Sequence, residues 1–147
     1  MPNWCKNFLG VTGPADDVKR FQKQAAELPP PPDSKSEWTP EVFSFQSLLP
    51  LPAKRRRPTA NPNGLGSPQQ EWGCRSDAFR SEQVEAWDGG VVYRFATLWN
   101  PPTRFFQKVS ERWPTLVFTL DYDEPLLAFR GLARAVKGDV QFLHLDL

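Results

Sequence analysis

Histidine and cysteine are scarce in this sequence, and long apolar runs are missing. The 147 residues include one histidine, His144, and two cysteines, Cys5 and Cys74. A metal site usually needs three or four Cys, His, Asp or Glu ligands, and an iron–sulfur cluster normally needs four cysteines. We therefore expect no metal, no iron–sulfur cluster and no other cofactor. No apolar stretch approaches the ~18 residues needed to cross a bilayer, so we expect no membrane contact.

The same scarcity bears on compartment and catalysis. The first residues show no charged region followed by an apolar run, as a signal peptide would, so we expect reduced thiols and a cytoplasmic location. A nucleophilic pair of Cys5 or Cys74 with His144 has no local signature to support it. We expect no catalytic residues. An enzyme with an unfamiliar site is the third of three alternatives for function.

The chain also has almost no net charge. Lys and Arg number 18 and Asp and Glu number 17, so no overall field draws the chain to nucleic acid or to a membrane. The exception is a run of four cations: Lys54, Arg55, Arg56 and Arg57. Such a run either meets phosphates or an acidic protein surface, or is a solvated loop that keeps the protein soluble.

Aromatic residues, in contrast, are abundant: 11 Phe, 6 Trp and 2 Tyr. Each large ring buries on the order of 150–250 Å², so few residues can build a sizeable core. The length suits one domain over residues 1–147. Tyr93 and Phe95 lie on an alternating segment, and we expect them to pack in the core rather than to stack nucleic-acid bases.

The order of periodic segments predicts the fold class. Strands are expected at 3–11, 41–46, 84–87, 91–99 and 115–122, helices at 14–28 and 101–113, and two further apolar segments at 126–136 and 140–147 flank a turn at 137–139. This order predicts an α+β, ferredoxin-like two-layer sandwich. We expect a mostly antiparallel sheet with two helices on one face and an extra C-terminal hairpin.

One segment, at about 48–71, interrupts this order. Residues 48–70 carry five prolines and two glycines together with the four cations. A loop of this length tends to be functional or disordered. We predict a long irregular basic loop that contributes little to the core.

Residues after this loop resemble an interface in composition. Trp72, Arg75 and Asp77 combine the residue types that binding hot spots favour, and Trp99 ends a predicted strand. The two tryptophans either bind a partner or fill the ends of the core. The predicted partner-binding residues are Lys54, Arg55, Arg56, Arg57, Trp72, Arg75, Asp77 and Trp99.

Several short strings occur in order along the chain. They are Met1-Pro2-Asn3-Trp4-Cys5-x-Asn7 with Gly13-Pro14, Phe43-x-Phe45, Leu49-Pro50-Leu51-Pro52, Trp72-Gly73 with Asp77-Ala78, Thr97-x-Trp99-x-Pro101-Pro102, and Tyr122-x-Glu124-Pro125. Together they resemble the Api92-like proteins. One departure is Cys74-Arg75-Ser76, because the family usually has a second tryptophan near position 76.

The resemblance implies a ferredoxin-like fold and an origin in phages, plasmids and integrated mobile elements. It does not imply an activity. This origin favours a mobile-element accessory protein in a bacterial host cell, and the lack of a catalytic set in the sequence, together with the irregular basic loop, favours non-catalytic binding to a macromolecular partner. A host or defence protein is the expected partner, and inhibition of a bacterial defence complex such as CRISPR is one form that this binding takes. The second alternative is a nucleic-acid-binding module that uses the basic loop.

Overall fold

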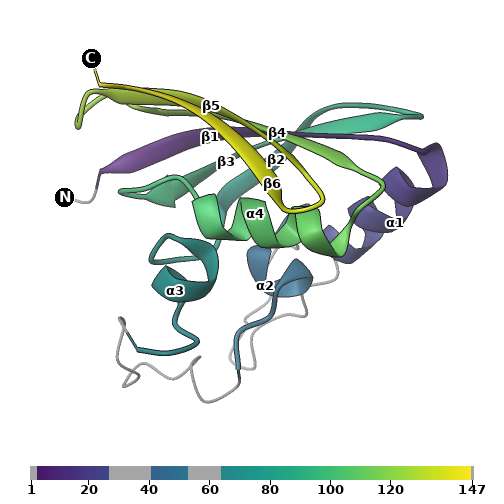
Figure 1. Cartoon of the computed structure of the whole chain (residues 1–147), viewed down its shortest axis with the longest axis horizontal. Coiled ribbons are helices and arrows are strands. Elements are labelled where there is room, and N and C mark those ends of the chain that lie inside the picture. Colours follow the sequence, from purple (N-terminus) through teal and green to yellow (C-terminus); the bar gives the residue numbers. More distant parts are fainter. Residues whose placement is uncertain (1–2, 27–40, 53–63, 147) are drawn as a thin grey trace, which may run out of the picture.

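Six strands form one antiparallel sheet in the order β2-β3-β1-β4-β5-β6. The computed structural model describes residues 3–26, 41–52 and 64–146. The four helices within these residues lie on one side of the sheet (Figure 1). In chain order the elements are β1 (Trp4–Thr12), α1 (Ala15–Ala25), α2 (Phe45–Leu48), α3 (Pro68–Trp72), β2 (Phe79–Trp87), β3 (Gly90–Leu98), α4 (Thr103–Arg112), β4 (Val117–Glu124), β5 (Phe129–Val136) and β6 (Asp139–Asp146).

The predicted fold class is confirmed. The elements β1-α1-β2-β3-α4-β4, with β1 between β3 and β4, form the ferredoxin-like α+β sandwich. The hairpin β5–β6 extends the sheet beyond β4, as the sequence predicts. The two short helices α2 and α3 are additions that the prediction lacked.

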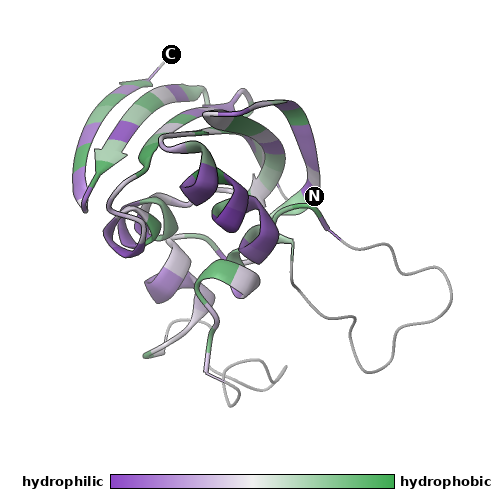
Figure 2. Cartoon of the chain, turned by 90° about the vertical axis from the view of Figure 1, so that its right-hand side faces the viewer, coloured by the Kyte–Doolittle hydropathy of each residue, from purple (hydrophilic) through white to green (hydrophobic). Residues whose placement is uncertain are grey.

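Alternating burial fixes which side of each strand faces the helices. In β1 the side chains of Cys5, Asn7, Leu9 and Val11 are buried, whereas Trp4, Lys6, Phe8 and Thr12 are exposed. In β4 the buried side chains are Phe118, Leu120, Tyr122 and Glu124. Figure 2 shows the resulting bands of alternating hydropathy along the strands. One contiguous core therefore lies between the sheet and the helices.

Helix α1 lies within the helix predicted at residues 14–28. Its buried side chains are Val18, Phe21 and Ala25, at spacings of three and four residues. Pro14 precedes the helix, and Asp16 and Asp17 lie in its first turn, where the helix dipole favours negative charge. The predicted continuation to residue 28 lies outside the described residues.

Helix α4 begins two residues later than the start at residue 101 that the sequence predicts. The helix begins at Thr103, with Pro102 rather than Asn100 in the capping position, and no side chain caps it. The carbonyl of Asn100 instead accepts a hydrogen bond from the buried hydroxyl of Thr97 at 2.6 Å.

The predicted strand at residues 41–46 is wrong. Residues 45–48 form the helix α2, because the side chain of Ser44 accepts a hydrogen bond from the backbone N–H of Gln46 and starts a helical turn. Phe43 and Phe45 are nonetheless both fully buried. Two phenylalanines that lie two residues apart can therefore both be buried when the residue between them is extended and the second one begins a helix.

The predicted irregular loop at 48–71 is wrong at both ends. Leu48, Leu49 and Leu51 are buried in the core. Leu48 ends α2, and Pro50, which cannot continue a helix, separates Leu49 from Leu51. At the other end, Ser67 caps α3 and Pro68 occupies its first turn. Residues 53–63, with the four cations, lie outside the described residues.

Phe43 is the centre of the aromatic core and gives a stability test. Its ring lies 4.9 Å from that of Tyr93, 5.0 Å from that of Phe95 and 5.8 Å from that of Phe105, between ring centroids. We expect Phe43→Ala to lower the free energy of unfolding by about 3–5 kcal/mol, because the ring leaves a cavity. The neighbouring Val42 is 39% exposed, so Val42→Ala should change it by about 0.5 kcal/mol or less. Urea unfolding measures both; equal effects would place Phe43 outside the core.

Candidate functional site

Trp72, a predicted partner-binding residue, belongs to the core. Its side chain is 3% exposed, its ring lies 5.5 Å from that of Phe45, and its indole N–H donates to the carbonyl of Leu49 at 3.1 Å. Tryptophan pairs an apolar body with one N–H that needs an acceptor when buried, and Leu49 supplies that acceptor. The predicted binding role of Trp72 is therefore corrected to core packing.

Asp77 is likewise used inside the molecule. Its carboxylate accepts hydrogen bonds from the hydroxyl of Ser44 at 2.7 Å and from the backbone N–H groups of Phe45 at 2.6 Å, Gln46 at 3.1 Å and Ala78 at 2.7 Å. Burial raises the pKa of this carboxyl, and these hydrogen bonds oppose the rise. Asp77 thus caps α2 from a distant part of the chain, and its predicted interface role is corrected.

Two of the remaining predicted partner-binding residues, Arg75 and Trp99, lie at least partly at the surface. Arg75 is exposed, and Trp99 is half-buried at the end of β3, with a left-handed φ of 68° and its N–H bonded to the carbonyl of Asn3. Both therefore remain accessible candidates. The cations 54–57 lie outside the described residues, so their role stays a prediction.

The two cysteines are buried thiols. Burial raises the pKa of Cys5 and of Cys74 to about 12, so neither is a ready nucleophile at neutral pH. His144 lies on β6, where its Nδ1 is 2.8 Å from the hydroxyl of Tyr122 and its ring stacks on the tyrosine ring. These contacts hold His144 against Tyr122, and none of them joins it to either thiol.

The sheet face away from the helices carries a surface that the prediction missed. The rings of Trp4 on β1 and Phe79 on β2 stack across β3, with centroids 5.0 Å apart and planes at 18°. Ala96 of β3 lies opposite Phe79 in the strand register, and its short side chain leaves room for this contact. The guanidinium of Arg80 lies 5.2 Å from the centre of the Phe79 ring, as a cation–π pair.

A hollow of about 510 Å³ adjoins these rings. Its walls include Lys6 and Phe8 of β1, Phe79 and Arg80 of β2 and Arg94 of β3. Together with Trp4 these residues form what we call the open-face patch: Trp4, Lys6, Phe8, Phe79, Arg80 and Arg94. The three rings are 37%, 39% and 44% exposed, for Trp4, Phe8 and Phe79.

Carboxylates are interleaved with the cations of this patch. Glu82 forms an ion pair with Arg94. In the register of β1 with β4, Asp123 lies opposite Lys6 and Asp121 lies opposite Phe8. Asp121 in turn pairs with Arg130 of β5 at 3.8 Å. The open face is therefore aromatic and charged with both signs in alternation.

The sequence contains a signal for this patch. Trp4, Lys6 and Phe8 alternate with the buried Cys5, Asn7 and Leu9, so a period of two runs through β1. Both sets include apolar residues, which favours a strand covered on both faces. Only the placement of all helices on one side reveals that Trp4 and Phe8 are left uncovered.

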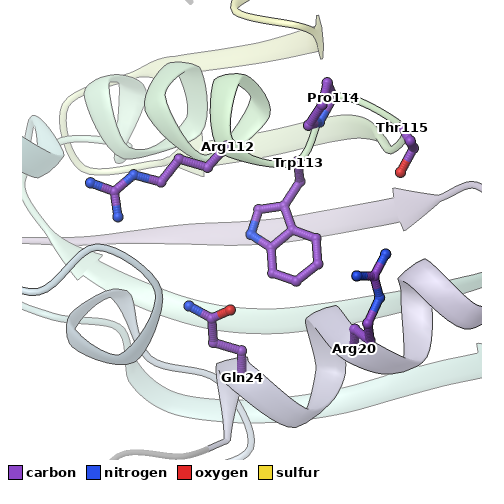
Figure 3. Close-up of a pocket in the computed structure, with 6 residues that line it drawn as sticks. All are labelled: Arg20, Gln24, Arg112, Trp113, Pro114 and Thr115. Carbon is purple, nitrogen blue, oxygen red and sulfur yellow. The ribbon is translucent and has the colours of Figure 1, made fainter.

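A second concave site lies between α1 and α4 (Figure 3). This cavity of about 470 Å³ is lined by Arg20, Gln24, Arg112, Trp113, Pro114 and Thr115. Its polar groups are largely engaged within the chain: Arg20 and Thr115 both bond to Asp17, and Arg112 donates to the carbonyl of Leu48. Trp113 contacts Phe21 edge to face at 5.3 Å. The cavity is therefore the junction between α1 and α4, and its polar groups already bond largely within the chain.

Metal ligands do not gather within residues 3–26, 41–52 and 64–146. No three His, Cys, Asp or Glu side chains come together there in a way that could hold an ion. None of the helices in this part of the chain is both long enough and apolar enough to span a bilayer.

The fold and sheet order place the chain among the ferredoxin-like α+β proteins. Residues 73–145 match the family described as the ferredoxin-like domain in Api92-like protein. The predicted resemblance is thereby confirmed. The crystal structure of a protein api92 from Yersinia pseudotuberculosis is similar over 99% of this chain and 97% of that one, with a TM-score of 0.67 and 12% identity, and so supports the fold. No curated protein matches the sequence.

Thiol reactivity tests the assignment of both cysteines. With a pKa of about 12, only about one thiol in ten thousand is ionised at pH 8. We expect Ellman's reagent to modify neither cysteine in the folded protein and both in concentrated urea. A Leu126→Cys variant is the positive control, because Leu126 is 76% exposed. Rapid modification of Cys5 or Cys74 in the folded wild type would restore the nucleophile hypothesis.

Proposed function

We propose that the protein acts without catalysis, in the cytoplasm of a bacterial host, by binding another protein on its open-face patch. The observation that carries the proposal is the preassembled stack of Trp4, Phe79 and Arg80 on the uncovered side of the sheet. Aromatic and arginine side chains dominate the binding energy of protein interfaces. A stack that is already ordered also loses little side-chain entropy on binding.

The charge distribution favours a protein over a nucleic acid. A phosphate backbone crossing the patch would meet the carboxylates of Glu82, Asp121 and Asp123 as well as the cations. A protein surface with charges of both signs can match such an alternating pattern. The predicted host or defence protein fits this chemistry, and inhibition of a defence complex remains the form of binding that the family resemblance favours.

One observation favours the nucleic-acid alternative. Antiparallel sheets of RNA-recognition domains stack bases on exposed aromatic rings, and here Trp4, Phe8 and Phe79 are exposed on such a sheet. Lys6, Arg80 and Arg94 lie beside them. The cations at 54–57 would add to this attraction if they lie near the patch.

Capture from a nuclease-treated bacterial lysate tests the proposal. We expect wild-type protein to retain a partner protein and a Trp4→Ala/Phe79→Ala double variant to lose it. Its affinity should fall by roughly 1,000-fold, because two hot-spot rings at about 2 kcal/mol each contribute about 4 kcal/mol. Leu126→Ala, at an exposed position outside the patch, should retain the partner. The double variant should lose about 1–2 kcal/mol of stability with the ring stack and still fold.

The outcome that contradicts the proposal is equally specific. If the double variant captures the same partner as wild type, the patch is not the binding site. If nothing survives nuclease treatment, and a labelled single-stranded oligonucleotide binds with an affinity that drops by orders of magnitude between about 50 and 200 mM salt, the nucleic-acid alternative is correct.

A further inference from the structure

The two edges of the sheet differ in their protection against pairing with another strand. The edge strand β2 is interrupted twice, between Phe79 and Glu82 and between Gln83 and Glu85. It also carries the charges of Arg80, Glu82 and Glu85. Bulges and charged side chains are the usual devices that keep an exposed edge from pairing. The β2 edge is therefore blocked.

The opposite edge, β6, has none of these devices between its ends. It pairs with β5 through eight consecutive residue pairs without a bulge, from Val136 with Asp139 to Phe129 with Asp146. Residues 140–145 contain no proline, glycine, lysine, arginine or carboxylate. Phe142, Leu143 and Leu145 are 51%, 56% and 49% exposed. A straight apolar edge of this kind is a template for another strand.

The hairpin turn determines which backbone groups face outward. Lys137 and Gly138 have φ of 53° and 82°, as in a two-residue type I′ turn closed by Val136 and Asp139. Hydrogen-bonded pairs alternate along an antiparallel ladder, so residues 139, 141, 143 and 145 bond to β5. The N–H and C=O groups of 140, 142, 144 and 146 consequently point away from the sheet.

We propose that β6 pairs antiparallel with β6 of a second copy of this chain, with Leu143 on the two-fold axis, so that the two sheets become continuous. In this register Phe142 lies opposite His144 of the other copy, and Val140 lies opposite Asp146. Every outward backbone group from 140 to 146 then finds a partner in both strands. A two-fold axis of this kind is the commonest symmetry of homo-oligomers.

Side chains on both faces of β6 fit a second copy. On the open face, Leu143 lies beside Leu132 of β5 in the register, and both are about half exposed. The two-fold axis would place Leu143 and Leu132 beside Leu143 and Leu132 of the second copy, so that the four leucines form one apolar row on the open face. On the helix side, Phe142 and His144 line a hollow of about 460 Å³ with residues of α4.

Charge placement also favours the second copy in this register. The carboxylates of β6 lie at its two ends, at Asp139 and Asp146. With Leu143 on the axis, each Asp146 faces Val140, and no two carboxylates lie opposite each other. Like charges directly opposite in a ladder would destabilise it. The strand is therefore compatible with itself as a partner.

Cysteine cross-linking tests both the dimer and its register. Cα atoms of a non-hydrogen-bonded antiparallel pair are about 4.5 Å apart, within the range that a disulfide spans. We expect Leu143→Cys to give a disulfide-linked dimer under mild oxidation. Leu145→Cys places its two thiols four residues apart along the ladder, about 13 Å, and should not cross-link at that rate. Val84→Cys on the β2 edge, 50% exposed, is the matched control.

Sedimentation of proteins without added cysteines completes the test. Wild type should show a concentration-dependent monomer–dimer equilibrium, and Leu143→Lys should sediment as a monomer with an unchanged circular dichroism spectrum. A wild type that stays monomeric at every concentration overturns the proposal. So does cross-linking of the Val84→Cys or Leu145→Cys variant as fast as that of Leu143→Cys, or a monomer whose β6 binds only a separate extended peptide.

Discussion

The carboxylate of Asp77 joins the start of β2 to the N-terminus of α2, a segment that lies 32 residues earlier in the chain at Phe45. It satisfies backbone N–H groups that no helical partner can reach. By fixing where α2 begins, it also fixes the two phenylalanines on either side of Ser44. These rings contact Tyr93, Phe95, Phe105 and Trp72, so one partly buried carboxylate helps to set how the aromatic core closes beneath the sheet.

The segment around Asp77 also divides the molecule into its two faces. Trp72 points into the core, Asp77 holds α2, and Phe79, two residues later, stacks on Trp4 on the opposite side of the sheet. Helices complete one face and leave the other with exposed rings and paired charges. The open face and the edge strand β6 are separate surfaces, so a dimer formed through β6 would leave the open-face patch of each copy accessible.

Local periodicity explains which parts of the fold could be predicted from the sequence. The alternation in β3 and β4 and the three–four spacing in α1 depend only on neighbouring residues, so the ferredoxin-like sandwich and the C-terminal hairpin were predictable. Helix α2 was not, because its Ser44 cap is supported by a carboxylate that lies 33 residues later in the chain. Composition alone made Trp72 and Asp77 resemble an interface, since it cannot show that their polar atoms have partners inside the molecule. The exposure of Trp4 and Phe8 was not predicted either. Their alternation with buried residues is visible in the sequence, but it does not show which face of the sheet the helices cover.

Chemical unfolding of an Asp77→Ala variant tests this account most directly. Removing the carboxylate leaves buried backbone donors without an acceptor, and we expect the free energy of unfolding to fall by about 2–4 kcal/mol. Arg75→Ala, two residues away at an exposed position, should change it by about 0.5 kcal/mol or less. If Asp77→Ala is as stable as Arg75→Ala, the carboxylate does not organise the core, and Asp77 becomes a candidate binding residue again.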